Sequence, residues 1–97
     1  MKQIYADKYR QIGLKIAYYR KLRGLTQEEL AEQVGLAPAF IGHLEAPNIT
    51  KALSLDALFD IAAVLGVSPH KFLLEPVFTR RKERGKIEIW KKKDGSR

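Results

Sequence analysis

The chain has 97 residues, no cysteine and a formal net charge of +7, which suits one domain with a modest core. The lack of cysteine excludes disulfides, cysteine-ligated zinc and a cysteine nucleophile. No apolar run approaches the roughly 18 residues that cross a bilayer, and the first residues lack the apolar stretch of a signal peptide, so we expect a cytoplasmic protein with no membrane partner.

The positive charge is concentrated at one end of the chain. Residues 1–75 hold nine Lys/Arg and eight Asp/Glu, a net of +1, whereas residues 76–97 hold nine and three, a net of +6. We therefore predict a nearly neutral helical domain over 1–75 and a basic C-terminal extension over 76–97. A basic segment of this kind favours a nucleic acid partner.

The first predicted helix runs from about Asp7 to Arg23 and ends at Gly24, which can leave the helix in a left-handed conformation. Its apolar residues recur at spacings of three and four, as one helical stripe requires. This stripe consists of Tyr5, Tyr9, Ile12, Ile16 and Tyr19.

The twenty residues from Thr26 to Glu45 predict two short helices joined by a tight turn. Thr26 and Glu29 have the spacing of a capping box, which satisfies free amides at a helix start. Gly35 can adopt the left-handed backbone that turns the chain, and Pro38 suits the first position of the next helix. Such a helix-turn-helix projects its second helix outward, toward a DNA major groove.

The remaining helices follow the same logic of caps and breakers. We expect helices over 27–34 and 38–45, the latter burying Ile41 and Leu44, and then a loop over 46–53. A fourth helix is predicted between a Ser54 cap and Gly66, with a buried face of Leu55, Leu58, Ile61, Ala62 and Leu65. A short fifth helix opens at a Ser68 cap followed by Pro69, and its Phe72 and Leu73 close the core.

Residues 77–97 leave two alternatives open. The segments 77–81 and 86–90 alternate apolar and polar residues around Gly85, which predicts a hairpin. The other interpretation is a disordered basic arm. Strand character at 87–90 is favoured, because an arm without a packing role has little use for Ile87, Ile89 and Trp90.

The chain resembles the phage-repressor, or XRE-type (Cro-like), helix-turn-helix family over about residues 9–74. The resemblance implies an all-α, five-helix lambda-repressor-like domain. The matching residues are Ile12, Ile16, Arg20, Gly24, Leu25, Thr26, Gln27, Glu28, Glu29, Leu30, Ala31, Gly35, Ile41, Leu44, Glu45, Leu55, Leu58, Ile61, Ala62, Leu65, Gly66, Val67 and Ser68.

The resemblance also implies roles for individual residues. Arg20 and Glu45 match a structural pair that ties the first helix to the end of the third, although two independent surface charges are the simpler alternative. Gln27 matches a position that contacts a DNA phosphate at a helix N-terminus; otherwise it is an ordinary helix-forming residue. The outer side of the 38–45 helix is expected to contact bases, through Pro38, Ala39, Phe40, Gly42 and His43.

This outer side departs from the family pattern, which usually places hydrogen-bonding residues there. Its one polar side chain is His43, for which base contact and simple solvation are equally supported. Ala39 and Phe40 could contact thymine methyl groups. Beyond Glu45, Pro47 has no amide to offer a phosphate.

Phosphate contacts are instead expected from the loop and from the basic extension. The loop residues are Asn48, Thr50 and Lys51, and those of the extension are Arg80, Arg81, Lys82 and Arg84.

The sequence predicts a sequence-specific DNA-binding transcriptional regulator, repressor-like and homodimeric. The dimer would form through the fourth and fifth helices, where Phe59 and Val64 lie off the core stripe, or through the 87–90 strand. The alternative is a protein-interaction module of antitoxin type, or a regulator subunit, with weak DNA binding. We expect no enzymatic activity, cofactor, metal or small-molecule substrate, because two histidines and solvated carboxylates such as Asp56 and Asp60 make no recognisable site.

Overall fold

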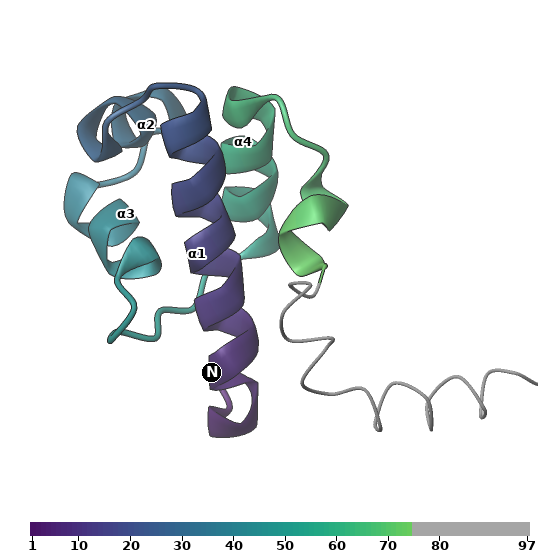
Figure 1. Cartoon of the computed structure of the whole chain (residues 1–97). Coiled ribbons are helices and arrows are strands. Elements are labelled where there is room, and N and C mark those ends of the chain that lie inside the picture. The colour runs from purple at the N-terminus through teal and green to yellow at the C-terminus, as the bar shows by residue number, and fades with distance from the viewer. Residues whose placement is uncertain (75–97) are drawn as a thin grey trace, which may run out of the picture.

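The computed structural model describes residues 1–74, and all regular structure in that range is helical (Figure 1). The elements are η1 (Gln3–Tyr5), α1 (Ala6–Leu22), α2 (Gln27–Val34), α3 (Pro38–Glu45), α4 (Leu55–Leu65) and η2 (Pro69–Leu73), where η denotes a 3-10 helix. In Figure 1, α1 stands in the middle, with α3 on one side and α4 and η2 on the other. The predicted all-α class is confirmed for this range. The predicted extension and its 87–90 strand lie outside it.

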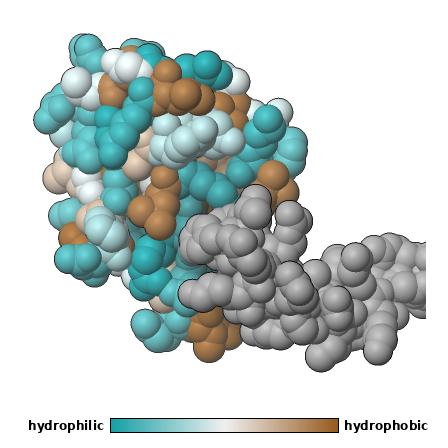
Figure 2. Space-filling view, in the orientation of Figure 1, coloured by the Kyte–Doolittle hydropathy of each residue, from teal (hydrophilic) through white to brown (hydrophobic). Residues whose placement is uncertain are grey.

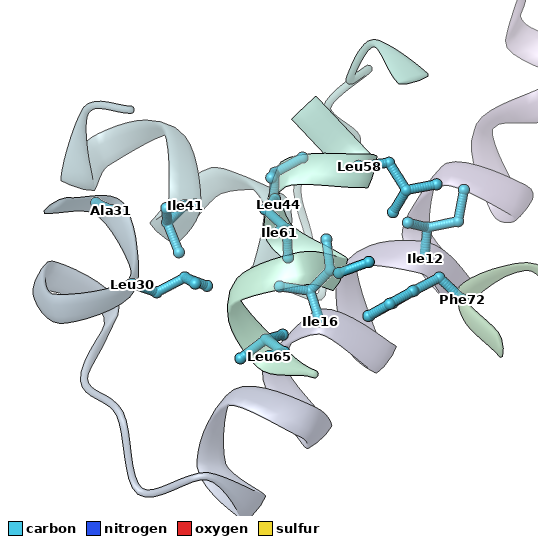
Figure 3. Close-up of a cluster of buried hydrophobic side chains, with 11 residues drawn as sticks. Ile12, Ile16, Leu30, Ala31, Ile41, Leu44, Leu58, Ile61, Leu65 and Phe72 are labelled. Carbon is cyan, nitrogen blue, oxygen red and sulfur yellow. The ribbon is translucent and has the colours of Figure 1, made fainter. Parts of the chain in front are cut away.

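The core is a cluster of buried apolar side chains that gathers residues from α1, α2, α3, α4 and η2 (Figure 3). Each of the larger ones contributes roughly 1.5–3 kcal/mol by leaving water. Ile41 and Leu44 hold one face of α3 against this cluster. The opposite face of α3 is therefore the one that is left for solvent. The cluster consists of Ile12, Ile16, Leu30, Ala31, Ile41, Leu44, Leu58, Ile61, Ala62, Leu65 and Phe72.

Helix α1 packs on this cluster through three residues of its predicted stripe, whereas Tyr5 and the half-buried Tyr9 are not part of the cluster. Ile12 and Ile16 are buried, and Tyr19 stacks edge-on against Phe72 with ring centroids 5.4 Å apart. Tyr5, which precedes α1, is instead 43% exposed and contributes little to the core.

Two leucines predicted to be buried are exposed. Leu55 is 63% exposed, because it occupies the first position of α4 and lies outside the core cluster. Leu73 is 60% exposed, since neighbouring residues of a 3-10 helix point about 120° apart and Phe72 already points inward.

The predicted fifth helix is the 3-10 helix η2 and not an α-helix. Pro69 stands at its start as expected, but the predicted Ser68 cap makes no side-chain hydrogen bond there. The caps of α4 are as predicted: the Ser54 hydroxyl accepts from the Ala57 amide at 3.1 Å, and the helix ends at Gly66 in the left-handed conformation. Helix α1 ends at Leu22 with Arg23 as its C-cap, one residue before the predicted Gly24.

The surface that α1 presents is hydrophilic with separate hydrophobic patches (Figure 2). Leu14, Tyr18 and Leu22 are exposed at four-residue spacing along this helix. None of the helices in residues 1–74 combines the length and the apolar character needed to cross a membrane.

Candidate nucleic-acid interface

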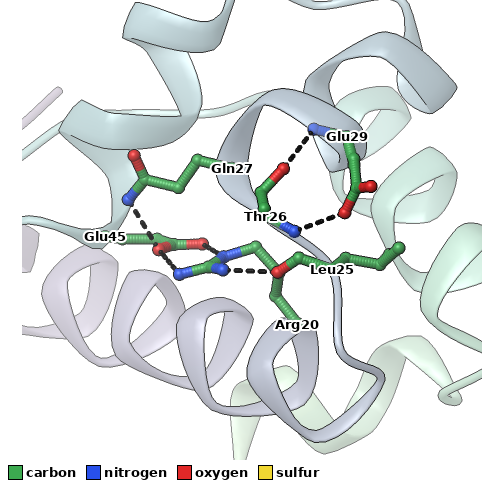
Figure 4. Close-up of polar contacts among 6 residues, drawn as sticks. All are labelled: Arg20, Leu25, Thr26, Gln27, Glu29 and Glu45. Atoms are coloured by element: carbon green, nitrogen blue, oxygen red, sulfur yellow. Dashed lines mark hydrogen bonds and ion pairs between the residues drawn. The ribbon is translucent and has the colours of Figure 1, made fainter.

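The helix-turn-helix is built as the sequence predicted, by a glycine turn and by the reciprocal caps of α2, which Figure 4 shows. The Thr26 hydroxyl accepts from the Glu29 amide at 3.0 Å, and the Glu29 carboxylate accepts from the Thr26 amide at 2.8 Å. Gly35 adopts φ +73° and ends α2, and Pro38 opens α3. The capping box sets the start of α2, and Gly35 and Pro38 set the turn into α3; none of these residues needs the outer side chains of α3 other than Pro38.

A buried ion pair ties α3 to α1, which confirms the predicted pairing of Arg20 with Glu45 (Figure 4). Arg20 Nε donates to Glu45 Oε2 at 2.7 Å, and Arg20 Nη2 donates to Oε1 at 2.8 Å. Arg20 Nη1 also donates to the Leu25 carbonyl at 2.6 Å. The hydrogen bond to Glu45 raises the pKa of the Arg20 guanidinium, although burial opposes the shift. An arginine is always charged in proteins, so the pair acts as a rigid two-point brace with one full charge on each side.

Gln27 joins this brace, which the sequence alone did not indicate. Its Nε2 donates to Glu45 Oε1 at 2.9 Å, so one carboxylate accepts from α1 and from α2 (Figure 4). The carboxamide of Gln27 also lies over Gly42 of α3, where its Oε1 would be 3.5 Å from an added Cβ atom. Gln27 is thus held at the junction of α2 and α3, and its contact with a DNA phosphate stays a prediction.

The outer side of α3 carries the residues predicted to face DNA bases. Pro38, Ala39 and His43 are exposed, whereas Phe40 and Gly42 are half buried. Phe40 packs against the core cluster, and the Lys51 ammonium lies over its ring, 5.6 Å from the centroid. The exposed side of α3 is thus small, uncharged and open, and a cation lies at its edge.

The loop over 46–53 brings some of the predicted phosphate contacts to this edge. Thr50 is half buried and accepts a hydrogen bond from Arg10 of α1 at 3.2 Å, and Asn48 and Lys51 are exposed. Arg10 is also paired with Asp7. The other predicted phosphate ligands, Arg80, Arg81, Lys82 and Arg84, lie outside the described residues.

Sequence reasoning also missed the contacts of Gly13 and Arg23, which hold α1 against α3 and α4. Gly13 of α1 is buried, and a Cβ atom there would clash with the Leu44 carbonyl group of α3, so the two backbones touch at this point. A lone glycine inside a helical pattern is the signal that could have found it. Arg23 donates through Nε to the Leu65 carbonyl at 2.6 Å and so ties the end of α1 to the end of α4; no local pattern marks such a contact.

This small all-α domain has the features of the helix-turn-helix class, because its braced α2–α3 pair presents the outer side of α3 to solvent. The helix-turn-helix family model matches residues 16–72. The chain belongs to this family and is of the XRE type. The sequence resemblance implied a lambda-repressor-like fold, and the all-helical structure matches that fold.

A related transcriptional regulator supports the same placement. The chain is 39% identical over 64 residues to the HTH-type transcriptional regulator SinR of Bacillus licheniformis, a match that covers 66% of this chain and 57% of SinR. The chain therefore matches little more than half the length of that relative.

Two solved structures share the fold. The crystal structure of the master regulator for biofilm formation SinR in complex with DNA aligns with a TM-score of 0.60 and 38% identity, over 65% of this chain and 98% of that one. The restriction-modification controller protein C.AhdI from Aeromonas hydrophila aligns with a TM-score of 0.62 and 29% identity, over 70% and 98%.

Proposed function

We propose that this protein is a sequence-specific, repressor-like transcriptional regulator that inserts α3 into the major groove of double-stranded DNA. The observation that carries the proposal is the exposed outer side of α3, held by the Arg20–Glu45–Gln27 brace. A groove-reading helix must be both accessible and fixed in angle, and α3 has both properties. The relation to SinR, whose structure is known in complex with DNA, supports this function.

Within this proposal, the exposed side chains of α3 contact the bases. Ala39, Pro38 and His43 face the bases, with His43 as the hydrogen-bonding residue and Ala39 beside thymine methyl groups. Phe40 is half buried and its ring lies under the Lys51 ammonium, so we assign it no base contact. Because so few side chains can read base edges directly, part of the specificity comes from DNA shape.

Affinity comes from phosphate contacts around this helix. Gln27 stands at the start of α2, where free amides and the helix dipole favour an anion. Asn48, Thr50 and Lys51 lie in the loop that follows α3. We propose that Arg80, Arg81, Lys82 and Arg84 of the basic extension add further contacts, since residues 76–97 carry most of the net charge.

The proposal includes a homodimer, which would place two copies of α3 about one helical turn apart on DNA. Phe59 on α4 is 48% exposed and is available for such a contact. Val64, the other residue predicted for this surface, packs against the core cluster instead. The protein would work in the cytoplasm, with binding and not catalysis as its activity.

A pair of matched charge insertions tests the proposal. Ala39 on α3 and Gln3 on η1 are both exposed. Ala39→Glu would bring a carboxylate toward the DNA phosphates and weaken binding to duplex DNA at least about tenfold. Gln3→Glu would add the same charge outside both α3 and the α4 surface proposed for the dimer, and would leave binding unchanged. Equal effects of the two substitutions would refute insertion of α3 into the groove.

The second candidate function is a protein-interaction module, which the apolar outer side of α3 and the exposed Leu14, Tyr18 and Leu22 of α1 favour. Binding to random duplex DNA across a salt series separates the two functions. If the extension binds phosphates, replacing its four predicted arginine and lysine ligands with glutamine lowers the log–log salt slope by up to roughly 0.9 for each. A full chain that binds no duplex even at low salt would favour the interaction module.

A further inference from the structure

The loop over 46–53 is held from two sides by side chains of different helices. From α1, Arg10 Nη2 donates to Thr50 Oγ1 at 3.2 Å. From α3, the Phe40 ring lies beneath the Lys51 ammonium at 5.6 Å. These contacts fix two consecutive residues of a loop that has no regular secondary structure. Loops that bind a ligand lose less conformational entropy when such contacts order them beforehand.

The Arg10 contact determines which hydrogen-bonding role is left to the Thr50 hydroxyl. A threonine hydroxyl has one donor hydrogen and two acceptor lone pairs. Since Thr50 Oγ1 accepts from the Arg10 guanidinium, its hydrogen stays available for another acceptor. A cationic donor also polarises the hydroxyl and strengthens a hydrogen bond from it to an anion. Arg10 is in turn anchored by Asp7 on the same helix.

The Phe40 contact determines where the Lys51 charge lies. A lysine side chain is long and flexible, and an ammonium over an aromatic face gains about 0.5–1 kcal/mol at an exposed site. Phe40 itself is partly buried against the core, so the platform is rigid. The ammonium therefore lies at the edge of α3, next in sequence to the Thr50 hydroxyl.

We propose that Arg10 and Phe40 are positioning residues for a phosphate clamp, in which the Thr50 hydroxyl and the Lys51 ammonium bind backbone phosphates of DNA. This assignment rests on the proposed function and deepens it. It gives Phe40 a role different from reading bases, since the ring face is used by Lys51. It also gives α1 a part in DNA binding, through a residue that need not touch the DNA.

The test measures the affinity of the full chain for a mixed-sequence duplex of about three helical turns across a salt series. Lys51→Gln should lower the log–log salt slope by roughly 0.9. Phe40→Leu, which keeps an apolar side chain but removes the ring face, should raise Kd about two- to fivefold in the wild-type background. It should have no effect in the Lys51→Gln background, because the residue it positions is gone.

The second half of the clamp is tested by the same logic. Thr50→Val removes the hydroxyl at nearly constant volume and should weaken binding, whereas Thr50→Ser should restore it. Arg10→Gln should weaken binding in the wild type but not in the Thr50→Val variant. Lys71→Gln, which removes an exposed charge from η2 on the other side of α1 from α3 (Figure 1), is the matched charge control. Thermal unfolding shows that each variant is folded at the temperature of the assay.

Three results would overturn the clamp while leaving DNA binding intact. Lys51→Gln could behave like the Lys71→Gln control. Phe40→Leu could weaken binding equally with and without Lys51, which would make Phe40 a direct DNA contact. Arg10→Gln could lower the salt slope by roughly 0.9 in the Thr50→Val background, which would make Arg10 itself the phosphate ligand. A wild-type chain without salt-dependent binding would overturn the clamp together with the proposed function.

Discussion

Replacing Arg20 with alanine is expected to destabilise the domain far more than removal of a surface charge would. The substitution deletes both hydrogen bonds to Glu45 and the one to the Leu25 carbonyl. It leaves a carboxylate that is only 4% exposed with Gln27 as its remaining partner among the contacts described above. Breaking a buried ion pair from one side costs about 3–5 kcal/mol, because the surviving charge is uncompensated.

A typical domain is stabilised by roughly 5–15 kcal/mol, so this loss is a large part of its free energy of unfolding. It should lower the melting temperature by more than about 12 °C. Chemical denaturation followed by circular dichroism measures the free energy of unfolding directly. Lys21→Ala is the matched control, since Lys21 is the exposed neighbour of Arg20, and should change stability by less than about 0.5 kcal/mol.

A further variant separates the charge from the geometry. Arg20→Lys keeps a cation but cannot donate two parallel hydrogen bonds to one carboxylate, so it should fall between wild type and Arg20→Ala. A loss below about 1 kcal/mol for Arg20→Ala, the value of an exposed pair, would refute the idea that this brace fixes α3.

Three further predictions concern the residues that shape the helix-turn-helix and its support. Gly13→Ala should cost at least about 3 kcal/mol in urea unfolding, because the new Cβ atom meets the Leu44 carbonyl of α3. Gly35→Ala should cost about 1–2 kcal/mol, because its site has open space but φ +73°. A larger loss for Gly35→Ala than for Gly13→Ala would contradict the close approach of α1 and α3. Thr26→Ala should cost about 1 kcal/mol by loss of the cap, while Thr26→Ser should be nearly neutral; equal losses in thermal melts would show that the hydroxyl is not the stabilising group. Phe72→Ala should cost about 3–5 kcal/mol, since the ring is completely buried; a calorimetric loss under about 1 kcal/mol would mean that η2 does not close the core.

The sequence predicted the helices well because their ends are encoded locally. Thr26, Gly35 and Pro38 each impose a backbone or capping requirement that needs no knowledge of the rest of the fold, and the bounds of α2 and α3 agree with the prediction. Leu55 and Leu73 were wrongly placed in the core. Helical spacing gives a direction but does not show whether another element covers that direction.

The contacts that were not predicted join segments far apart in the chain. Arg10 meets Thr50, Gln27 meets Glu45 and Arg23 meets Leu65, and no spacing rule connects such pairs. The Arg20–Glu45 pair was predicted because a family resemblance supplied the partner. Long-range polar contacts therefore require either a structure or a relative, whereas caps and turns require neither.

The most direct test of the central claim is a map of backbone amide chemical shifts for the full chain with and without duplex DNA. We expect the largest changes on α3 around Ala39 and His43, on the start of α2 at Gln27, and on the loop at Thr50 and Lys51. Changes confined to α4 and η2, with α3 unaffected at saturating DNA, would contradict this expectation.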